Sequence, residues 1–336
     1  MTGCFIVQPI HPDGVARLEA AGIPVRFASS PAMNVVAREI GSACAVITRD
    51  AGMDAHAIAA AGALRIIASH GAGVNRIDFD QARARSVIVT NTPGTNARSV
   101  AEYTIGLMLA LARRIPEADS AVRDGNWDFR YSPEMVQLHG RCLGLVGFGA
   151  IAQQVARIAR DGFGMHVAAW SPGAPDALLA QYPVTRASSL HALLAASDVV
   201  SLHRPLRPDT QGMIDDAALH AIKPGALLIN TGRGALVDND ALRRALEDRR
   251  VMAAALDVFT TEPPAQDDPV RTMPRTLLTP HIGGTTEEAL SATACQCAEQ
   301  VIDCLAGRTP AHIVPAPIRD GKIDCAAPNN ISRKIL

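Results

Sequence analysis

The sequence predicts an α/β fold with two domains, each built on a parallel β-sheet. Short runs of β-branched residues alternate with alanine-rich amphipathic stretches, which is the pattern of strands joined by crossover helices. A Gly-x-Gly turn between a predicted strand and a predicted helix lies in the middle of the chain rather than at its start. The length of 336 residues exceeds what one ordinary core holds, so a second domain is expected before that turn.

The part of the chain before the glycine turn is predicted to be a first α/β unit. Its predicted strands are Phe5–Val7, Ala45–Thr48, Arg65–Ser69 and Val87–Thr90. The segment Ser99-Val100-Ala101-Glu102 then has the spacing of a capping box and predicts the start of a long apolar helix, Tyr103–Arg113, that connects the two domains.

The second unit is predicted to be a doubly wound parallel sheet. Its predicted strands are Leu143–Val146, Met165–Trp170, Asp198–His203, Ala226–Asn230, Met252–Asp257 and Thr276–Thr279. Six is the number of strands in a Rossmann-type nucleotide-binding sheet.

A helix expected over Glu287–Ala306 returns the chain to the first unit, so the nucleotide-binding domain is predicted to be an insertion. Residues 99–286 form this six-stranded Rossmann-type domain. Residues 1–98 and 287–318 are predicted to form a split, smaller flavodoxin-like α/β domain, and residues 319–336 a C-terminal tail without a clear pattern.

The composition favours a cytoplasmic protein with a small-molecule ligand. The formal net charge of −1 provides no basic field for nucleic acid or for an anionic membrane. The seven cysteines have no CxxC spacing and an odd total, which favours reduced thiols over a disulfide framework or a metal site. The first residues enter a predicted strand without a charged leader or a long apolar run.

The glycine turn has the pattern of a dinucleotide-binding loop. Gly147 allows a tight turn, and Gly149 lets the backbone approach a pyrophosphate. The helix predicted over Ile151–Arg160 presents free N–H groups and a partial positive charge. Ala152 holds the third position, where a small residue suffices. NAD or NADP is therefore the expected cofactor, although a glycine turn can also join any strand to any helix.

Three polar residues follow predicted strands of the second unit, at the edge where parallel sheets bind ligands. Arg233 has a guanidinium that can grip a carboxylate and polarise an adjacent carbonyl. His281 can exchange a proton with a carbonyl oxygen, and Glu262 can fix its tautomer and favour its charged form. Taken singly, the three could instead be a helix cap, a histidine beside a turn and an exposed loop acid.

Four segments resemble signatures of the D-isomer-specific 2-hydroxyacid dehydrogenase family. They are Gly147-x-Gly149, Thr231–Asp238, Asp257–Phe259 with Glu262-Pro263, and Thr279–Gly284. The resemblance covers about residues 4 to 315 and implies hydride transfer between NAD(P) and a small 2-oxo or D-2-hydroxy acid. It also implies a homodimer formed through the nucleotide-binding domain, for which the helix Tyr103–Arg113 is the candidate contact, although burial inside the monomer would give the same apolar pattern.

The resemblance assigns a role to individual residues. Arg233 binds the substrate carboxylate and carbonyl, His281 is the acid/base catalyst, and Glu262 orients it. The cofactor-binding positions that it implies are Thr104, Gly147, Gly149, Ala150, Ile151, Ser171, Arg204, Thr231, Gly232, Arg233, Asp257, His281, Gly283 and Gly284. No metal is implied.

A loop of the first unit, Ser69–Asn75, resembles the family's substrate loop. Its N–H groups near Ala72, Gly73 and Val74 are expected to bind the substrate carboxylate together with Arg233 and His281, in a cleft between the domains. Asn75 departs from the aspartate that many relatives have there. An ordinary glycine turn would give the same pattern.

The strand that ends at Trp170 is followed by Ser171, where an NAD-selective site usually has an acid. Electrostatic rejection of the 2′-phosphate is therefore absent, and Arg204 could pair with that phosphate, so NADP is expected to be accepted as well as NAD. Arg204 could equally be a solvated surface residue.

The substrate is less well defined by the sequence. Arg49 and His70 could line the cleft and suit hydroxypyruvate, glyoxylate or phosphohydroxypyruvate. We expect a glyoxylate or hydroxypyruvate reductase. The alternatives are a phosphoglycerate dehydrogenase-like enzyme, a phosphite dehydrogenase and a non-catalytic NAD(H)-sensing binding protein. A formate dehydrogenase is disfavoured, because that family pairs its histidine with glutamine rather than with a residue like Glu262.

Overall fold

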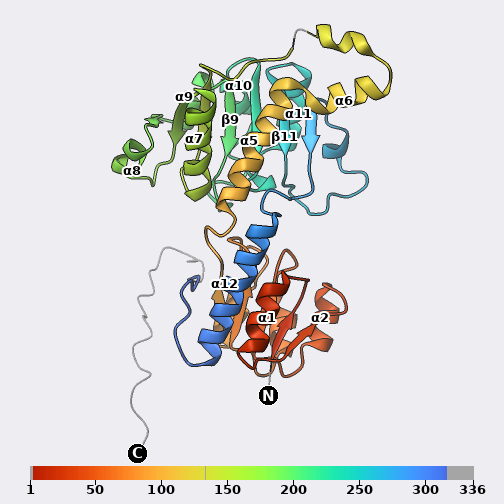
Figure 1. The fold of residues 1–336 in the computed structure, drawn as a ribbon, viewed down its shortest axis with the longest axis vertical. Coiled ribbons are helices and arrows are strands. Elements are labelled where there is room, and N and C mark those ends of the chain that lie inside the picture. Colours follow the sequence, from red (N-terminus) through yellow and green to blue (C-terminus); the bar gives the residue numbers. More distant parts are fainter. Residues whose placement is uncertain (1–2, 133, 316–336) are drawn as a thin grey trace, which may run out of the picture. The chain divides into compact units, whose positions relative to one another are not determined.

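The computed structural model describes residues 3–132 and 134–315, which form two units. Unit 1 consists of Met1–Pro93 and Ser291–Leu336, and unit 2 consists of Gly94–Leu290 (Figure 1). The predicted tail, residues 319–336, lies outside the described residues.

Unit 1 contains a five-stranded parallel sheet with the strand order β2-β1-β3-β4-β5, the order of flavodoxin-like folds. The strands are β1 (Cys4–Ile6), β2 (Val25–Phe27), β3 (Ala45–Thr48), β4 (Ile66–Ser69) and β5 (Ile88–Thr90). The prediction missed β2. This edge strand is three residues long and partly exposed, so it lacks the apolar run that identifies a buried strand.

Alternate residues of the unit 1 sheet face two different layers of helices. Ile6 and Ile47 pack on the side of α1 and α12, whereas Phe5 and Val46 pack on the side of α2 and α3. The helices are α1 (Pro12–Ala20), α2 (Met33–Glu39), α3 (Ala55–Ala60), α4 (Phe79–Ala84) and α12 (Glu287–Leu305). A sheet covered on both faces has apolar residues at nearly every position, as these strands do.

Unit 2 contains a seven-stranded parallel sheet with the order β12-β11-β10-β9-β6-β7-β8. The strands are β6 (Cys142–Val146), β7 (His166–Trp170), β8 (Thr185–Arg186), β9 (Val199–Leu202), β10 (Ala226–Asn230), β11 (Val251–Leu256) and β12 (Thr276–Leu278). The strand order reverses between β6 and β9, which makes their carboxyl ends the expected ligand-binding point of a Rossmann sheet. The predicted count of six was wrong, because β8 is only two exposed residues and has no apolar pattern.

Helices cover both faces of this sheet. Helices α5 and α7 pack against Leu143 and Leu145 on one face, and α9, α10 and α11 pack against Val200 and Leu228 on the other. The helical elements are α5 (Ala97–Arg113), α6 (Ile115–Arg123), η1 (Trp127–Tyr131), α7 (Ala150–Phe163), α8 (Asp176–Gln181), α9 (Leu190–Ala196), α10 (Asp216–Ala221), η2 (Gly234–Leu236), α11 (Asn239–Glu247) and η3 (Pro269–Thr272).

Two expectations about the connecting helix were wrong. Helix α5 begins at Ala97, so Ser99 lies inside it and is not an N-cap; its hydroxyl instead contacts that of Thr286 at 2.8 Å. The apolar residues Leu107, Met108 and Leu111 are buried in the core of unit 2. They are therefore not the available dimer contact that the sequence suggested.

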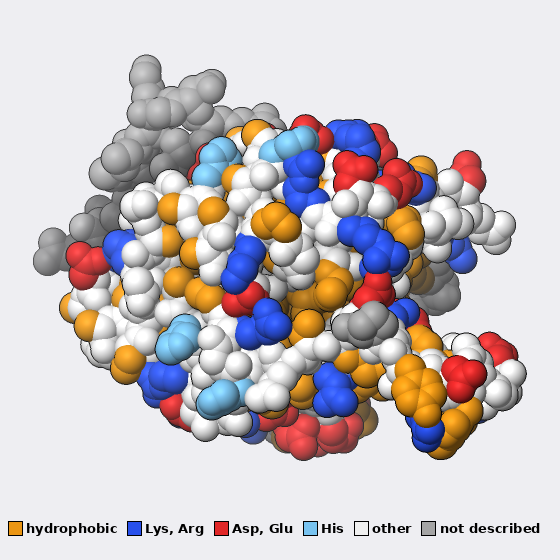
Figure 2. Space-filling model, turned by 90° about the horizontal axis from the view of Figure 1, so that it is seen from above, with side chains coloured by type: hydrophobic (Ala, Val, Ile, Leu, Met, Phe, Trp, Pro, Cys, Tyr) orange, Lys and Arg blue, Asp and Glu red, His pale blue; other side chains and the backbone are white. Residues whose placement is uncertain are grey.

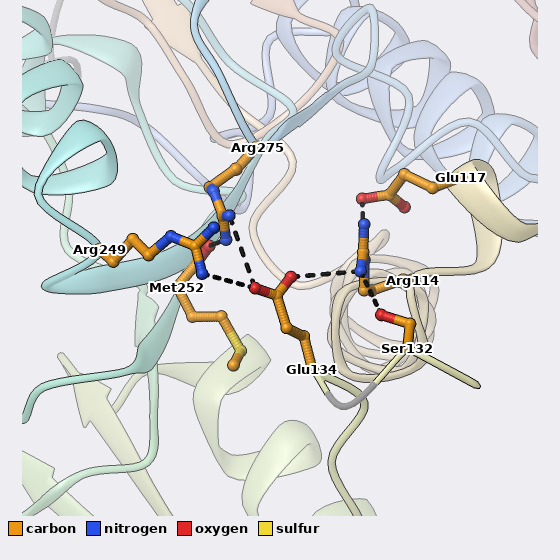
Figure 3. A network of polar contacts seen from close by, with 7 residues as sticks. All are labelled: Arg114, Glu117, Ser132, Glu134, Arg249, Met252 and Arg275. Atoms are coloured by element: carbon orange, nitrogen blue, oxygen red, sulfur yellow. Dashed lines mark hydrogen bonds and ion pairs between the residues drawn. The ribbon is translucent and has the colours of Figure 1, made fainter. Parts of the chain in front are cut away.

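The segment after α5, residues 115–132 with α6 and η1, extends away from the sheet (Figure 1), and we call it the arm. Its base is held by Glu134, whose carboxylate contacts Arg249 at 2.7 Å, Arg114 at 3.2 Å and Arg275 at 3.7 Å (Figure 3). Arg249 and Arg275 directly precede β11 and β12, so this cluster ties the arm to the amino-terminal edge of the sheet.

Within the described ranges, no helix is long and apolar enough to cross a membrane. Every cysteine in those ranges is a free thiol.

Candidate active site

The glycine turn lies at the switch point of the unit 2 sheet. Gly147 has a φ of +99°, and a Cβ there would lie 2.7 Å from the carbonyl oxygen of His203, so only glycine fits. Gly149 is the N-cap of α7, and among the described residues no side chain caps this helix. Gly149 and Ala150 are exposed. The first N–H groups of α7 are thus available to an anion, and the residues fit a dinucleotide pyrophosphate.

Ser171 follows β7 in a turn that is held by an arginine the sequence analysis had not identified. Arg186 of β8 donates to the carbonyl of Ser171 at 3.2 Å, and it also contacts the carbonyl of Ala174 and the carboxylate of Asp176. Ser171 itself is buried. The signal that could have found Arg186 was weak, because its strand has no apolar pattern.

Arg204 follows β9 and lies over the ring of Trp170, with 5.7 Å between its guanidinium carbon and the ring centroid. Its side chain is 17% exposed, and Asp209 is 3.8 Å away, a long ion-pair distance. Its Nε is buried without a hydrogen-bond partner in the described part of the chain. Arg204 is therefore not the solvated surface arginine of the alternative interpretation, and it sits beside the residue that precedes Ser171.

The loop after β10 is organised by hydrogen bonds to buried side chains. Thr104 of α5 donates to the carbonyl of Val100 at 2.8 Å, so the 3.1 Å contact between the two hydroxyls is donated by Thr231. Asn230 accepts from the N–H of Gly232 and donates to the carbonyl of Arg233, both at 3.0 Å. Asn230 is a positioning residue that sequence reasoning missed, although an asparagine at a strand end is a known turn signal.

Gly234 joins the arginine loop to the glutamate loop. A Cβ at Gly234 would lie 2.0 Å from the carbonyl carbon of Phe259, so the two loops touch through backbone alone. Phe259 in turn donates its N–H to Oε1 of Glu262 at 3.0 Å. The position of Glu262 therefore depends on the same contact that places the Arg233 loop.

His281 and Glu262 form the pair that the sequence predicted. Nδ1 of His281 lies 3.0 Å from Oε2 of Glu262, with the two side chains 39% and 22% exposed. His281 has a φ of +54°, which is an unfavourable backbone conformation for a residue with a Cβ. Arg233, Glu262 and His281 thus follow the three neighbouring strands β10, β11 and β12 at one edge of the sheet.

Asp257, directly after β11, accepts hydrogen bonds from the loop that carries His281. Its carboxylate accepts from the hydroxyl of Thr279 at 2.7 Å and from the N–H groups of Ile282 and Gly283 at 2.9 Å. It is 1% exposed. A Cβ at Gly284 would lie 2.7 Å from the side-chain amide nitrogen of Asn96, so that side chain would have to move. Cofactor contacts of Asp257, Gly283 and Gly284 stay predictions.

The glycine loop of unit 1 follows β4 and presents amides. The carbonyls of Gly71, Ala72 and Gly73 each accept a hydrogen bond, from the N–H of Thr92, the amide of Asn91 and the hydroxyl of Ser69 respectively. Among the described residues, no acceptor receives the N–H groups of Ala72, Gly73 or Val74. A loop whose carbonyls are hydrogen-bonded and whose N–H groups have no acceptor has the features of a backbone anion-binding nest.

Comparisons with known proteins found related sequences and structures. The family model described as "D-isomer specific 2-hydroxyacid dehydrogenase, NAD binding domain" matches residues 105–283. A D-3-phosphoglycerate dehydrogenase of Mycobacterium tuberculosis is 40% identical over 305 residues, which are 90% of this chain and 57% of that protein. A glyoxylate reductase of Thermococcus litoralis is 40% identical over 261 residues, 75% of this chain and 77% of that protein. The crystal structure of a Thermus thermophilus protein superimposes with a TM-score of 0.85 at 34% identity and covers 94% of this chain and 100% of that one.

Proposed function

The chain belongs to the D-isomer-specific 2-hydroxyacid dehydrogenase family, and we propose that it interconverts a small 2-oxo acid and its D-2-hydroxy acid with a nicotinamide cofactor. The observation that carries the proposal is the contact between His281 and Glu262, beside the loop of Arg233 at the ligand-binding edge of a Rossmann sheet. The chain spans only 53–60% of the length of the phosphoglycerate dehydrogenases it matches, so the activity of those proteins is not carried over as a fact.

The proposed proton transfer follows from the chemistry of His281, Glu262 and Arg233. In reduction, a bound nicotinamide supplies the hydride to the carbonyl carbon. His281 donates a proton from Nε2 to the carbonyl oxygen, and Glu262 stabilises the imidazolium before the transfer. Arg233 binds the substrate carboxylate and polarises the carbonyl. In oxidation, His281 takes the proton back.

The residues around the glycine turn support a dinucleotide as the cofactor. Gly147 has a positive φ and no room for a Cβ, so the backbone can come close to a pyrophosphate there. The N–H groups at the start of α7, which no described side chain caps, can then bind that pyrophosphate. At the far end of the cofactor, Ser171 carries no charge that would repel a 2′-phosphate, and Arg204 lies over the ring of Trp170, the residue before Ser171. We therefore propose that NADP is accepted at least as well as NAD.

The substrate is proposed to be a short 2-oxo acid such as glyoxylate or hydroxypyruvate. The open amides of Ala72, Gly73 and Val74 are suited to a carboxylate, and so is the guanidinium of Arg233. Arg49 is less available than the sequence suggested, because its guanidinium donates to the carbonyl of Pro9 at 3.1 Å. The runner-up is 3-phosphohydroxypyruvate, since relatives named phosphoglycerate dehydrogenase share 40% identity with this chain.

The experiment that tests this proposal is an activity matrix of NADH and NADPH against glyoxylate, hydroxypyruvate, 3-phosphohydroxypyruvate, pyruvate and 2-oxoglutarate. Turnover with glyoxylate or hydroxypyruvate is expected, with the D-hydroxy acid as the product from hydroxypyruvate. Tight binding of NAD(H) without turnover of any oxo acid would contradict the enzyme and favour a nucleotide-sensing protein.

A homodimer is also proposed, and the arm is its proposed contact. Four large apolar side chains of the arm are exposed: Ile115, Val122, Trp127 and Tyr131. Figure 2 shows hydrophobic side chains gathered on a projecting lobe of the surface. Clusters of this kind mark interfaces in soluble proteins, and a two-fold dimer would bury two such arms.

A further inference from the structure

The segment between β7 and β8 contains one acid, and an arginine of β8 binds it. Residues 171–184 include a single carboxylate, that of Asp176. Arg186 is the last residue of β8, which pairs in parallel with β7 and places Arg186 opposite Ala169. The carboxyl ends of parallel strands lie at the same edge of a sheet, so Arg186 lies at the edge where Ser171 follows β7.

All three nitrogens of the Arg186 guanidinium contact this segment. Nη1 donates to the carbonyl of Ser171 at 3.2 Å, and Nη2 donates to the carbonyl of Ala174. Nε donates to the carboxylate of Asp176. A planar guanidinium that is held at three points keeps one orientation. The carboxylate of Asp176 therefore binds the same guanidinium as the backbone of Ser171.

The charge of this segment is balanced by Arg186. Among the described residues, Asp176 has no other ionic partner. Arg204 follows β9 and has its own acid, Asp209, at 3.8 Å. Without the guanidinium of Arg186, the carboxylate of Asp176 would be an uncompensated negative charge on the turn that starts at Ser171.

Such a charge bears on the choice between NAD and NADP. An NAD-selective Rossmann site has an acid at the end of this strand, and its charge repels a 2′-phosphate. Ser171 replaces that acid here, but Asp176 follows only five residues later. An unpaired carboxylate at that point would repel the same phosphate, because like charges on one turn are too close to be fully screened.

We propose that Arg186 determines cofactor specificity: by binding Asp176 it neutralises the turn after β7 and allows the 2′-phosphate of NADP to approach Ser171 and Arg204. This inference rests on the proposed acceptance of NADP. An arginine that only attached the short strand β8 to the sheet would affect NAD and NADP equally.

The test measures binding without turnover. Adenosine 2′,5′-bisphosphate and 5′-AMP differ only in the 2′-phosphate, so the ratio of their dissociation constants in titration calorimetry reports on that group. Wild type is expected to bind the bisphosphate more tightly. Arg186→Met should lower this preference on the order of fivefold, a modest change because the pair with Asp176 is exposed to solvent. The affinity for 5′-AMP should stay close to that of wild type, which also shows that the variant is folded.

A second variant separates the charge of Asp176 from the loss of the arginine. Arg186→Met combined with Asp176→Asn removes both charges and should recover most of the preference for the bisphosphate. The matched control is Arg244→Met, which removes an arginine paired with Asp216 at 2.9 Å elsewhere in unit 2. This control should keep the preference of wild type.

The outcomes separate this inference from the proposed function. An unchanged preference in Arg186→Met, or a loss that Asp176→Asn does not restore, would overturn the inference and leave the proposed dehydrogenase standing. A wild type that binds both nucleotides equally and reduces glyoxylate with NADH would overturn the inference and the acceptance of NADP, but not the hydride transfer. A loss that Asp176→Asn restores, in a protein that reduces no oxo acid, would support the role of Arg186 and contradict the proposed function instead.

Discussion

Nδ1 of His281 lies 3.0 Å from Oε2 of Glu262, while Oε1 of the same carboxylate accepts the N–H of Phe259 at 3.0 Å. A backbone N–H therefore holds one oxygen of the carboxylate in place, and the other oxygen contacts the imidazole. Because an ionised carboxylate only accepts, Nδ1 carries a proton, and Nε2 is the nitrogen left to exchange a proton with substrate.

Replacing His281 with alanine should lower kcat by a factor on the order of 10² to 10⁴, the usual contribution of a positioned acid/base group. Steady-state reduction assays with wild type and His281→Ala measure this. The matched control is His191→Ala, since His191 lies on α9, outside the candidate site. Equal kcat in wild type and His281→Ala, with hydride transfer shown to limit the rate, would refute the assignment.

Replacing Arg233 with lysine keeps the charge and removes the planar fork. We expect KM for the 2-oxo acid to rise and kcat to fall, each by roughly tenfold or more, because the proposed role of the guanidinium is to contact both the carboxylate and the reacting carbonyl. Arg243→Lys on the exposed face of α11 is the control and should behave as wild type. An effect on cofactor KM alone would place Arg233 in the cofactor site only.

Introducing an acid at Ser171 should move cofactor preference toward NAD. Ser171→Asp places a carboxylate where it accepts from the ribose hydroxyl and repels a 2′-phosphate. The ratio of kcat/KM for NADPH to that for NADH is expected to fall at least tenfold, and Ser171→Asn, which has the same shape without the charge, should change it less. A wild type that strongly prefers NADH would contradict the premise.

Much of the fold follows from local patterns. The strands β6 and β10 are apolar runs bounded by glycine or polar turns, and the sequence located both. The strands β2 and β8 lie at sheet edges and are short and exposed, so backbone pairing creates them without a side-chain pattern. The capping box at Ser99 failed for a related reason: its hydroxyl is used in a contact with Thr286, far away in sequence.

The candidate site divides in the same way. Arg233, Glu262 and His281 could be proposed because each is a polar residue just after a strand. The role of Asn230 could not, since it depends on which backbone groups the fold brings within reach of its side chain.

The ion cluster at the base of the arm should make the stability of the fold depend on pH. Although partial burial opposes it, the charges of Arg275, Arg249 and Arg114 hold the pKa of Glu134 below its ordinary value. A carboxyl with a lowered pKa in the folded state stabilises the fold above its unfolded pKa, near 4.3, and loses that contribution as pH falls through the folded pKa. Glu134→Gln should therefore melt a few degrees below wild type at pH 7, and the gap should close in acid.

The half-buried His203, whose pKa desolvation lowers to about 4, also destabilises the fold as pH falls from about 6.5, but equally in both proteins. The difference between their melting curves thus isolates Glu134. Glu102→Gln, which breaks an exposed pair with Arg98 on α5, is the control and should change little at any pH. A gap that stayed constant down to pH 3 would show that the carboxylate charge is not the cause.

The arm should determine the oligomeric state. Trp127 and Tyr131 are 65% and 68% exposed, and the Glu134 cluster fixes the base of the segment that carries them. Wild type is expected to have twice the mass of one chain in analytical ultracentrifugation. Trp127→Ser combined with Tyr131→Ser should shift it toward the monomer, because the proposed contact would lose its two large aromatic side chains. The control is Phe27→Ser, which should leave the mass unchanged. Phe27 is also a large apolar residue, 51% exposed, but it lies on the edge strand β2 of unit 1. A dimer that survives the double substitution would place the contact outside the arm, and a monomeric wild type would remove the interface altogether.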